Sequence, residues 1–172
     1  MNNKFFKLGV LVVLTMLFSA LAIAQTTWYV NSTNGDDLIY DGKFAVASGP
    51  SNGPYKTIAK AVGAAVSGDI ISIAAGAYTE GNVSIGQNLT LVSTNFLSSN
   101  VVTITNGVTI STAAKTINLG RTADGSLQFN LGTTATALVL TAGTLNIDQA
   151  NVTVGSGGTI TRTAGTLNAT PT

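Results

Sequence analysis

Three aspartates lie close together near residue 40, and they give this chain its clearest candidate metal site. Asp36, Asp37 and Asp41 belong to a segment that also contains Asn34. Ca²⁺ takes several oxygen ligands, carboxylates among them. The same side chains also accept hydrogen bonds from nearby backbone N–H groups and so shape loops. Their spacing matches neither an EF-hand nor the nonapeptide calcium repeat. The sequence therefore favours a loop-shaping role, with Ca²⁺ as the alternative, and no other cofactor is expected.

The composition excludes several other kinds of chemistry. The chain has 172 residues and contains neither His nor Cys. It therefore has no His-based acid–base catalyst, thiol nucleophile, disulfide or His/Cys metal site. Only 9% of the residues are charged and the formal net charge is +1, so we expect no nucleic-acid partner. The abundance of Thr favours strands over helices.

Residues 1–24 have the pattern of a secretory signal peptide. Lys4 and Lys7 supply the positive start, an apolar stretch follows, and Ala22-Ile23-Ala24 forms a small-x-small cleavage site. The apolar stretch is short for a membrane-spanning helix. We therefore expect a mature protein that begins at Gln25, is secreted or held at the cell surface, and does not span the membrane.

Residues 25–81 are expected to form an N-terminal cap and a first coil. Residues 28–30 and 70–73 read as short strands, and Thr57 stands where a helix N-cap would. A helix is predicted between these strands, because apolar residues recur there with helical spacing. Those residues are Ile58, Ala61, Val62, Ala65 and Val66.

Six aromatic residues of the same part could either bind sugar rings or pack the cap against the first coil. We predict packing, because aromatic side chains bury large apolar areas. The six are Trp28, Tyr29, Tyr40, Phe44, Tyr55 and Tyr78.

Residues 82–172 follow a different pattern, in which short apolar pairs at i and i+2 alternate with turn-forming residues. Such pairs predict strands with one buried face. The pairs are Val83/Ile85, Leu89/Leu91, Val102/Ile104, Val108/Ile110, Ile117/Leu119, Leu127/Phe129, Leu138/Leu140, Leu145/Ile147 and Val152/Val154.

One segment of this region is repeated without change. Thr141–Asn146 recurs 22 residues later as Thr163–Asn168, and Ile117 lies 21 residues before Leu138. A period of about 22 residues without an internal helix predicts a β-solenoid. Stacked coils would place Asn146 next to its counterpart in the second copy, extending the backbone hydrogen bonding through stacked side chains. A β-sandwich also has short strands at regular spacing, and the exact repeat favours the solenoid over it.

The order of motifs in residues 28–92 resembles the entry segment of secreted right-handed parallel β-helix proteins, the pectin-lyase-like group. The matching motifs are Trp28-Tyr29-Val30, Asn34-Gly35-Asp36-Asp37, Asp41-Gly42, Pro54-Tyr55-Lys56-Thr57-Ile58, Ala59-Lys60-Ala61, Gly68-Asp69-Ile70-Ile71-Ser72-Ile73, Ala75-Gly76-Ala77-Tyr78-Thr79-Glu80 and Asn88-Leu89-Thr90-Leu91. The resemblance implies an all-β fold, a right-handed parallel β-helix with a short N-terminal capping helix. The residues after 92 match this group only in their alternation of short apolar pairs with turn-forming residues.

This group includes lyases and esterases that act on acidic polysaccharides, together with surface proteins of no known chemistry. The esterases use paired Asp carboxylates with an Arg nearby, and here Asp124 and Asp148, with Arg121 and Lys115, are the residues that could correspond. Asp124 is followed by Gly in a turn dipeptide, and Asp148 follows a predicted strand. We therefore favour turn roles for both and assign no catalytic residue.

The C-terminal coil has no evident cover. No helix, aromatic cluster or charged segment follows the second repeat copy, and Arg162 stands where the first copy has Leu140. A charge there would discourage further strand pairing, but solenoids need a terminal cap. We therefore expect this coil to continue in a longer protein or to self-associate.

These observations together predict an exported, non-enzymatic β-helix protein that serves as a structural or adhesive module of the cell surface or extracellular space. The alternative is a β-helix that binds or degrades carbohydrate. The expected partners are polysaccharides or other cell-surface components.

Overall fold

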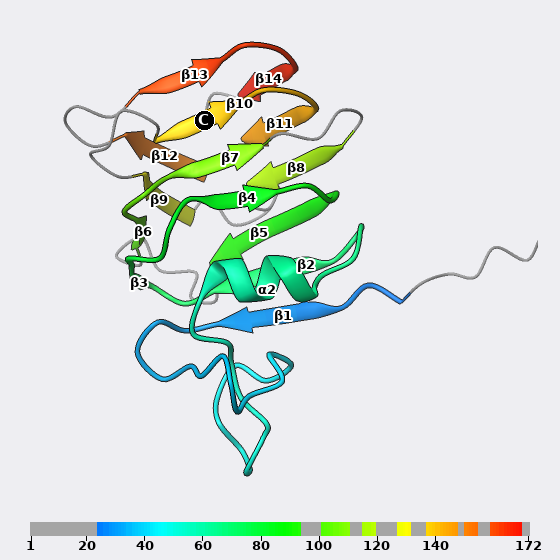
Figure 1. Ribbon diagram of the computed structural model, residues 1–172, viewed down its shortest axis with the longest axis vertical. Coiled ribbons are helices and arrows are strands. Elements are labelled where there is room, and N and C mark those ends of the chain that lie inside the picture. Colours follow the sequence, from blue (N-terminus) through cyan, green and yellow to red (C-terminus); the bar gives the residue numbers. More distant parts are fainter. Residues whose placement is uncertain are drawn as a thin grey trace, which may run out of the picture.

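The computed structural model describes residues 24–93, 101–110, 115–119, 127–131, 137–147, 150–154 and 159–169. These residues form fourteen short strands and one short helix (Figure 1). Every strand pair among them is parallel. The prediction of an all-β chain with a single short helix is confirmed for this part of the chain. The parallel pairing also speaks against a sandwich of antiparallel sheets.

The strands belong to three sheets. The six-stranded sheet contains, in spatial order, β1 (Thr27–Val30), β2 (Ile70–Ile73), β5 (Leu89–Ser93), β8 (Thr116–Leu119), β11 (Thr144–Ile147) and β14 (Thr166–Ala169). A four-stranded sheet contains β4 (Val83–Ile85), β7 (Val108–Ile110), β10 (Leu138–Leu140) and β13 (Ile160–Arg162). The other four-stranded sheet contains β3 (Gly76–Tyr78), β6 (Val101–Ile104), β9 (Leu127–Leu131) and β12 (Ala150–Val154).

From β2 onward, the described strands visit the three sheets in rotation. β2, β3 and β4 each enter a different sheet, and β5, β6 and β7 then pair with them in the same order. The next strands repeat this cycle up to β14, so the chain builds a stack of coils with one strand per sheet in each coil (Figure 1). This arrangement is compatible with a β-solenoid.

The length of a coil varies along the stack. Asn146 pairs with Asn168, 22 residues later, as the sequence repeat predicted. Asn118 pairs with Asn146, and these two residues are 28 apart. Ile117 therefore corresponds to Leu145 and not to Leu138, which lies in another sheet. The uniform period of about 22 residues was wrong for the earlier coils, because stacking fixes the strands and leaves the length of the connecting loops free.

The predicted helix is present but ends earlier than its apolar pattern. α2 (Ile58–Ala64) begins after Thr57, whose side-chain oxygen accepts a hydrogen bond from the Lys60 N–H, as an N-cap residue does. Ala65 is already extended. Val66 therefore leaves the helical face and is 49% exposed, where the spacing predicted burial.

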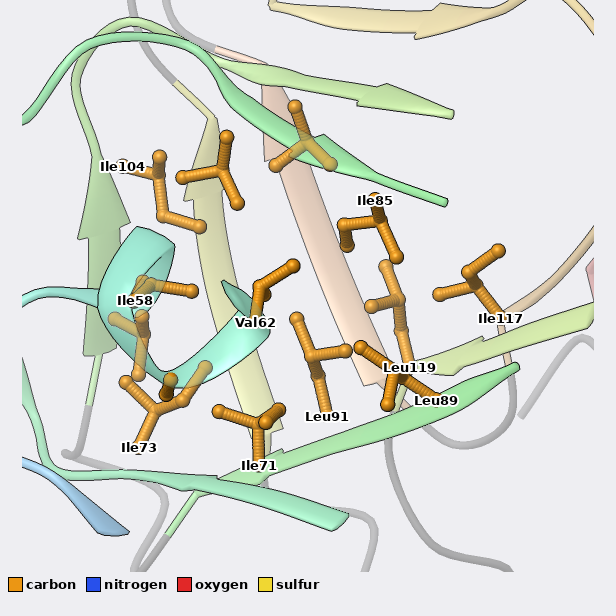
Figure 2. Close-up of a cluster of buried hydrophobic side chains, with 14 of the residues drawn as sticks. Ile58, Val62, Ile71, Ile73, Ile85, Leu89, Leu91, Ile104, Ile117 and Leu119 are labelled. Carbon is orange, nitrogen blue, oxygen red and sulfur yellow. The ribbon is translucent and has the colours of Figure 1, made fainter. Parts of the chain in front are cut away.

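The apolar face of α2 covers one end of the core. Ile58 and Val62 are buried and lie close to Ile71 and Ile73 of β2 (Figure 2). The helix contacts β1, β2 and β4, which come from two different sheets. Burial of each aliphatic side chain stabilises the fold by roughly 1.5–3 kcal/mol.

Alternate strand residues line the interior of the stack. The pairs predicted for β4, β5, β6, β7, β8 and β10 are buried, and so is Leu145 of β11. Ile147 packs against this core while partly exposed. The predicted inward positions in β9 and β12 lie outside the described side chains. Residues 1–23 of the predicted signal peptide also lie outside the described residues.

Candidate functional site

The three aspartates of the predicted metal site belong to residues 31–57, the cap loop, which lies at the α2 end of the stack (Figure 1). Asp36 folds back on its own turn, where Oδ1 accepts hydrogen bonds from the Leu38 N–H at 2.8 Å and the Ile39 N–H at 2.9 Å. These two hydrogen bonds lower the pKa of Asp36. The carboxylate therefore holds a turn, the role that short acidic side chains commonly play.

Asp37 and Asp41 also hold backbone segments. Asp37 accepts hydrogen bonds from the Lys56 N–H at 2.7 Å, the Thr57 N–H at 3.1 Å and the Thr57 hydroxyl at 2.7 Å. Asp41 accepts one from the Lys43 N–H at 3.1 Å. Within the described residues, no group of three or more acidic side chains is placed to hold a metal ion. This geometry supports the loop-shaping role, and Ca²⁺ binding stays an untested prediction.

Asp69 joins the first strand to the end of the helix, a role that the sequence did not reveal. Its side chain is buried. It accepts hydrogen bonds from the Thr26 N–H at 2.9 Å, the Trp28 indole N–H at 2.8 Å and the Val66 N–H at 2.9 Å. Desolvation acts to raise the pKa of this carboxyl, but the three hydrogen bonds outweigh it and lower the pKa. The only sequence signal was an acidic residue just before a buried strand.

Glu80 holds the other end of α2. Its two carboxylate oxygens accept hydrogen bonds from the Ile58 and Ala59 N–H groups, both at 2.7 Å. The Glu80 backbone carbonyl accepts a further bond from the Asn106 side chain at 2.7 Å. Desolvation raises the pKa of Glu80 against the opposing effect of its backbone hydrogen bonds. Glu80 therefore anchors the capping helix to the first coil.

The aromatic residues mostly pack the cap. The rings of Trp28 and Tyr55 stack with centroids 5.9 Å apart and planes at 10°. The Lys43 ammonium lies 5.5 Å from the Trp28 ring centroid. Tyr78 is buried, its hydroxyl donates to the Ala74 carbonyl at 2.7 Å, and desolvation raises its pKa to about 12. Phe44 departs from the packing prediction, because 42% of its surface is exposed.

Two glycines allow the aromatic rings to lie directly against the backbone. A Cβ atom on Gly42 would come within 2.4 Å of the Tyr55 ring, and one on Gly53 within 2.6 Å of the Tyr40 ring. Gly42 also has a positive φ of 72°, which disfavours other residues. A side chain at either glycine would therefore collide with an aromatic ring of the cap loop.

An open pocket of about 240 Å³ lies beside Glu80. Two of its polar side chains hold the capping helix and the loop before it: Glu80 accepts hydrogen bonds from the start of α2, and the Thr57 hydroxyl donates to Asp37. The lining residues are Ser32, Lys56, Thr57, Ala77, Tyr78, Thr79 and Glu80.

The candidate esterase residues Asp124, Asp148 and Arg121 lie outside the described residues. Lys115 is described, and its backbone carbonyl accepts a hydrogen bond from the Thr144 N–H at 2.8 Å. A catalytic role for the aspartate pair therefore stays a prediction of the sequence alone.

The predicted asparagine stacking is present and longer than expected. Asn168 donates to the Asn146 side-chain oxygen at 2.9 Å, and Asn146 donates to the Asn118 oxygen at 2.7 Å. Asn118 in turn donates to the Thr90 hydroxyl at 3.3 Å. This row, the asparagine ladder, runs across four strands of the six-stranded sheet and adds side-chain hydrogen bonds to the backbone pairing.

β13 and β14 form the opposite end of the stack, and no described helix lies over it as α2 lies over the N-terminal end (Figure 1). Ile160 is 50% exposed and Leu167 is 37% exposed, although their strand partners Leu138 and Leu145 are buried. Arg162 pairs with Leu140, as the repeat predicted. Its guanidinium donates to the Gly165 carbonyl at 2.8 Å and so bends back onto its own turn.

Comparisons with protein-family models, with curated proteins and with solved structures find no match to this chain. Among the residues that the structure describes, no helix combines the length and the apolar character needed to cross a membrane. Function is therefore inferred from the geometry of the chain itself.

Proposed function

We propose that this chain is an exported, non-enzymatic β-helix protein that serves as a structural or adhesive module of the cell surface or extracellular space. We further propose that its coils wind as a right-handed parallel β-helix of the pectin-lyase-like kind. The rotation of successive strands through three parallel sheets and the apolar helix over one end of the core support this assignment. Right-handed connections between parallel strands are the strong general preference.

One observation carries the non-enzymatic assignment. Every described carboxylate accepts hydrogen bonds from the backbone of its own chain, and the set comprises Asp36, Asp37, Asp41, Asp69 and Glu80. A general acid or base must exchange a proton with a substrate within hydrogen-bond reach. These carboxylates instead use their oxygens to hold turns, the first strand and the capping helix in place.

The outer face of the six-stranded sheet supports a structural or adhesive role. The asparagine ladder and the Thr side chains paired in register at Thr116, Thr144 and Thr166 give this face a regular, uncharged polar surface. Such a surface can hydrogen-bond to neutral polar groups of a cell surface, and no residue of the six described strands of this sheet is charged.

The proposal that the chain is exported depends on the positive residues Lys4 and Lys7 and on the predicted cleavage site Ala22-Ile23-Ala24. Mass spectrometry of the protein recovered from the medium or cell surface of an expressing host should find a mature N-terminus at Gln25. An intact Met1 on exported protein would contradict this part of the proposal.

A panel of neutral and acidic polysaccharides tests the non-enzymatic assignment. We expect no loss of polymer length on incubation with the purified chain, measured by size-exclusion chromatography and by release of reducing ends. Cleavage or deacylation that the wild type performs and Asp148→Asn or Asp124→Asn abolishes would establish the polysaccharide-degrading alternative. Retardation of the chain on a polysaccharide affinity gel without cleavage would instead identify the ligand of an adhesive module.

A further inference from the structure

The open pocket beside Glu80 has the size of a site for one small ring. Its volume of about 240 Å³ lies a little below the range of about 300–1,000 Å³ that is typical of sites for drug-sized molecules. Because the pocket is open, a ligand can enter it directly from solvent. All of its lining residues belong to the part of the chain that the structure describes.

The walls of the pocket come from segments far apart in the sequence, and hydrogen bonds hold these segments together. Ser32 follows β1, residues 56–57 precede α2, and residues 77–80 form the end of β3 and the residues after it. Glu80 accepts hydrogen bonds from the first turn of α2, and Asp37 accepts them from residues 56 and 57. A site that is already formed in this way loses little conformational entropy when a ligand binds.

The walls combine a positive group, a negative group and a hydroxyl. Lys56 is exposed, its ammonium can donate three hydrogen bonds, and its backbone N–H is held by Asp37. Each Glu80 carboxylate oxygen accepts one backbone N–H at 2.7 Å and has the capacity to accept a second donor. Thr79 adds an exposed side chain whose hydroxyl can donate and accept. The pocket can therefore both donate hydrogen bonds to a ligand and accept them from it.

The charges around the pocket favour a neutral ligand over an ionic one. The Lys56 ammonium repels a cation, and the carboxylates of Glu80 and Asp37 repel an anion. Desolvation raises the pKa of Glu80, and the negative charge of Asp37 raises it further. Carboxyl groups perturbed in this way and placed in a cleft are typical of functional sites. A neutral polyol suits both signs of charge, because a hydroxyl group can accept from an ammonium and donate to a carboxylate.

We propose that this pocket binds one neutral sugar unit, whose ring hydroxyls hydrogen-bond to the Lys56 ammonium, the Thr79 hydroxyl and the Glu80 carboxylate. The inference rests on the proposed adhesive function and names its ligand as a neutral glycan. The size of the pocket suits the terminal unit of that glycan. Binding leaves the hydrogen bonds between Glu80 and α2 in place, because each carboxylate oxygen accepts a second donor.

Titration of the isotope-labelled, purified chain with the methyl glycosides of glucose, galactose and mannose, followed by nuclear magnetic resonance, tests the proposal. One or more of these glycosides should bind with a Kd in the millimolar range, as suits a ligand of a single ring. Binding should shift the backbone amide signals of residues 32, 56 and 77–80. Lys56→Met keeps the length of the side chain but removes its donors, and it should weaken binding by about tenfold or more. Thr79→Val replaces the hydroxyl with a methyl group and should weaken binding by about fivefold.

Lys60→Met is the matched control. Lys60 is also an exposed lysine, but it lies on α2 outside the pocket lining, with its ammonium 5.7 Å from the Tyr55 ring centroid. This variant should leave the affinity unchanged, and circular dichroism verifies that every variant is folded. The proposal would be overturned by the absence of amide shifts with all three glycosides, or by equal weakening in Lys60→Met and Lys56→Met. Tighter binding of galacturonate or of zwitterionic glycine would overturn it as well.

The polysaccharide affinity gel separates failure of the pocket from failure of the adhesive function. Retardation of a wild type that binds none of the glycosides would overturn the pocket proposal and leave the adhesive function standing. Retardation that Lys56→Met abolishes and Lys60→Met preserves would support both. Release of reducing ends by the wild type would contradict the non-enzymatic assignment, whereas the pocket proposal would still be decided by the titration.

Discussion

The two ends of the stack differ in what covers the same kind of core. At the N-terminal end, α2 lies over the interior (Figures 1 and 2), and the cap loop hydrogen-bonds to Tyr29 and Asn31 along the edge of β1. Asp69 and Glu80 fix this cover by accepting backbone hydrogen bonds. At the C-terminal end, β13 and β14 repeat the strand pattern with their apolar residues exposed.

Two identical segments show what this difference means for individual residues. Thr141–Asn146 and Thr163–Asn168 have the same sequence and pair in register at their strands. Leu145 in the first copy is fully buried, whereas Leu167 in the second is 37% exposed. Burial in a stack of coils therefore depends on whether a further layer covers the residue, and the local sequence does not decide it.

The largest effect is expected at the fully buried copy of the repeated Leu. Leu145→Asp removes an aliphatic side chain from the core and buries a carboxylate without a partner, so it should destabilise the fold by about 5 kcal/mol. Thr144→Asp changes the outward neighbour and should be tolerated. Leu167→Asp should cost much less than Leu145→Asp in dilute solution. Chemical denaturation measures all three, and equal losses would show that the inward faces are assigned wrongly.

The next largest effect concerns the closed end. Asp69→Ala leaves the Thr26, Trp28 and Val66 N–H groups without their acceptor, and we expect a loss of about 3 kcal/mol in the free energy of unfolding. Asp41→Ala is the control, because that side chain accepts a single exposed hydrogen bond, and it should change stability by less than about 0.5 kcal/mol. Similar losses in the free energy of unfolding for the two variants would show that Asp69 does not anchor the cap.

The pH dependence of stability separates the two carboxylates that hold α2. The pKa of Asp69 is lowered in the folded state, so its contribution is present above the ordinary carboxyl pKa of about 3.9 and is lost as the pH falls through the folded value. The pKa of Glu80 is raised, so its contribution is present at low pH and is lost as the pH rises through the folded value.

Denaturation at a series of acidic pH values measures these opposing contributions. Asp69→Asn should lower stability at neutral pH and flatten the loss on acidification. Glu80→Gln should make that loss steeper. The reverse order of slopes would contradict the assigned pKa directions.

The smallest effect is expected along the asparagine ladder. Asn146→Ala removes two side-chain hydrogen bonds and should cost about 1–2 kcal/mol, whereas Asn168→Ala removes one and should cost about 1 kcal/mol or less. Differential scanning calorimetry of both variants measures this order. A greater loss at Asn168 would mean that the last rung of the ladder is not at an open end.

Local patterns predicted the elements of this fold well. The alternation of apolar residues identified strands such as β4 and β10, and the spacing of Ile58, Ala61 and Val62 identified the capping helix. These signals are short-range, because alternation reports one buried face of a strand and a 3.6-residue period reports one buried face of a helix. Val66 was misplaced because the helix ended at Ala64, and helix ends are poorly marked in sequence.

Long-range features were harder to predict. The exact repeat fixed the register of the last two coils, but it implied a uniform period that the Asn118–Asn146 spacing of 28 contradicts. Asp69 and Glu80 were not identified as anchors, because the hydrogen-bond partners of their carboxylates lie up to 43 and 22 residues away, respectively. The three clustered aspartates were a candidate metal site, but each accepts hydrogen bonds from backbone N–H groups, in its own turn for Asp36 and Asp41 and 19 to 20 residues away for Asp37.

The stacking of neighbouring coils is tested most directly by paired cysteines, since the natural chain contains none. Neighbouring strands lie about 4.8 Å apart, within the Cα separation that a disulfide spans. Asn118 and Asn146 are aligned on neighbouring strands, whereas Thr90 and Asn146 are separated by a whole strand. We predict that Asn118→Cys/Asn146→Cys forms an intramolecular disulfide on mild oxidation and that Thr90→Cys/Asn146→Cys does not. Cross-linking of the second pair, or failure of the first pair in the folded protein, would contradict the parallel stack of coils.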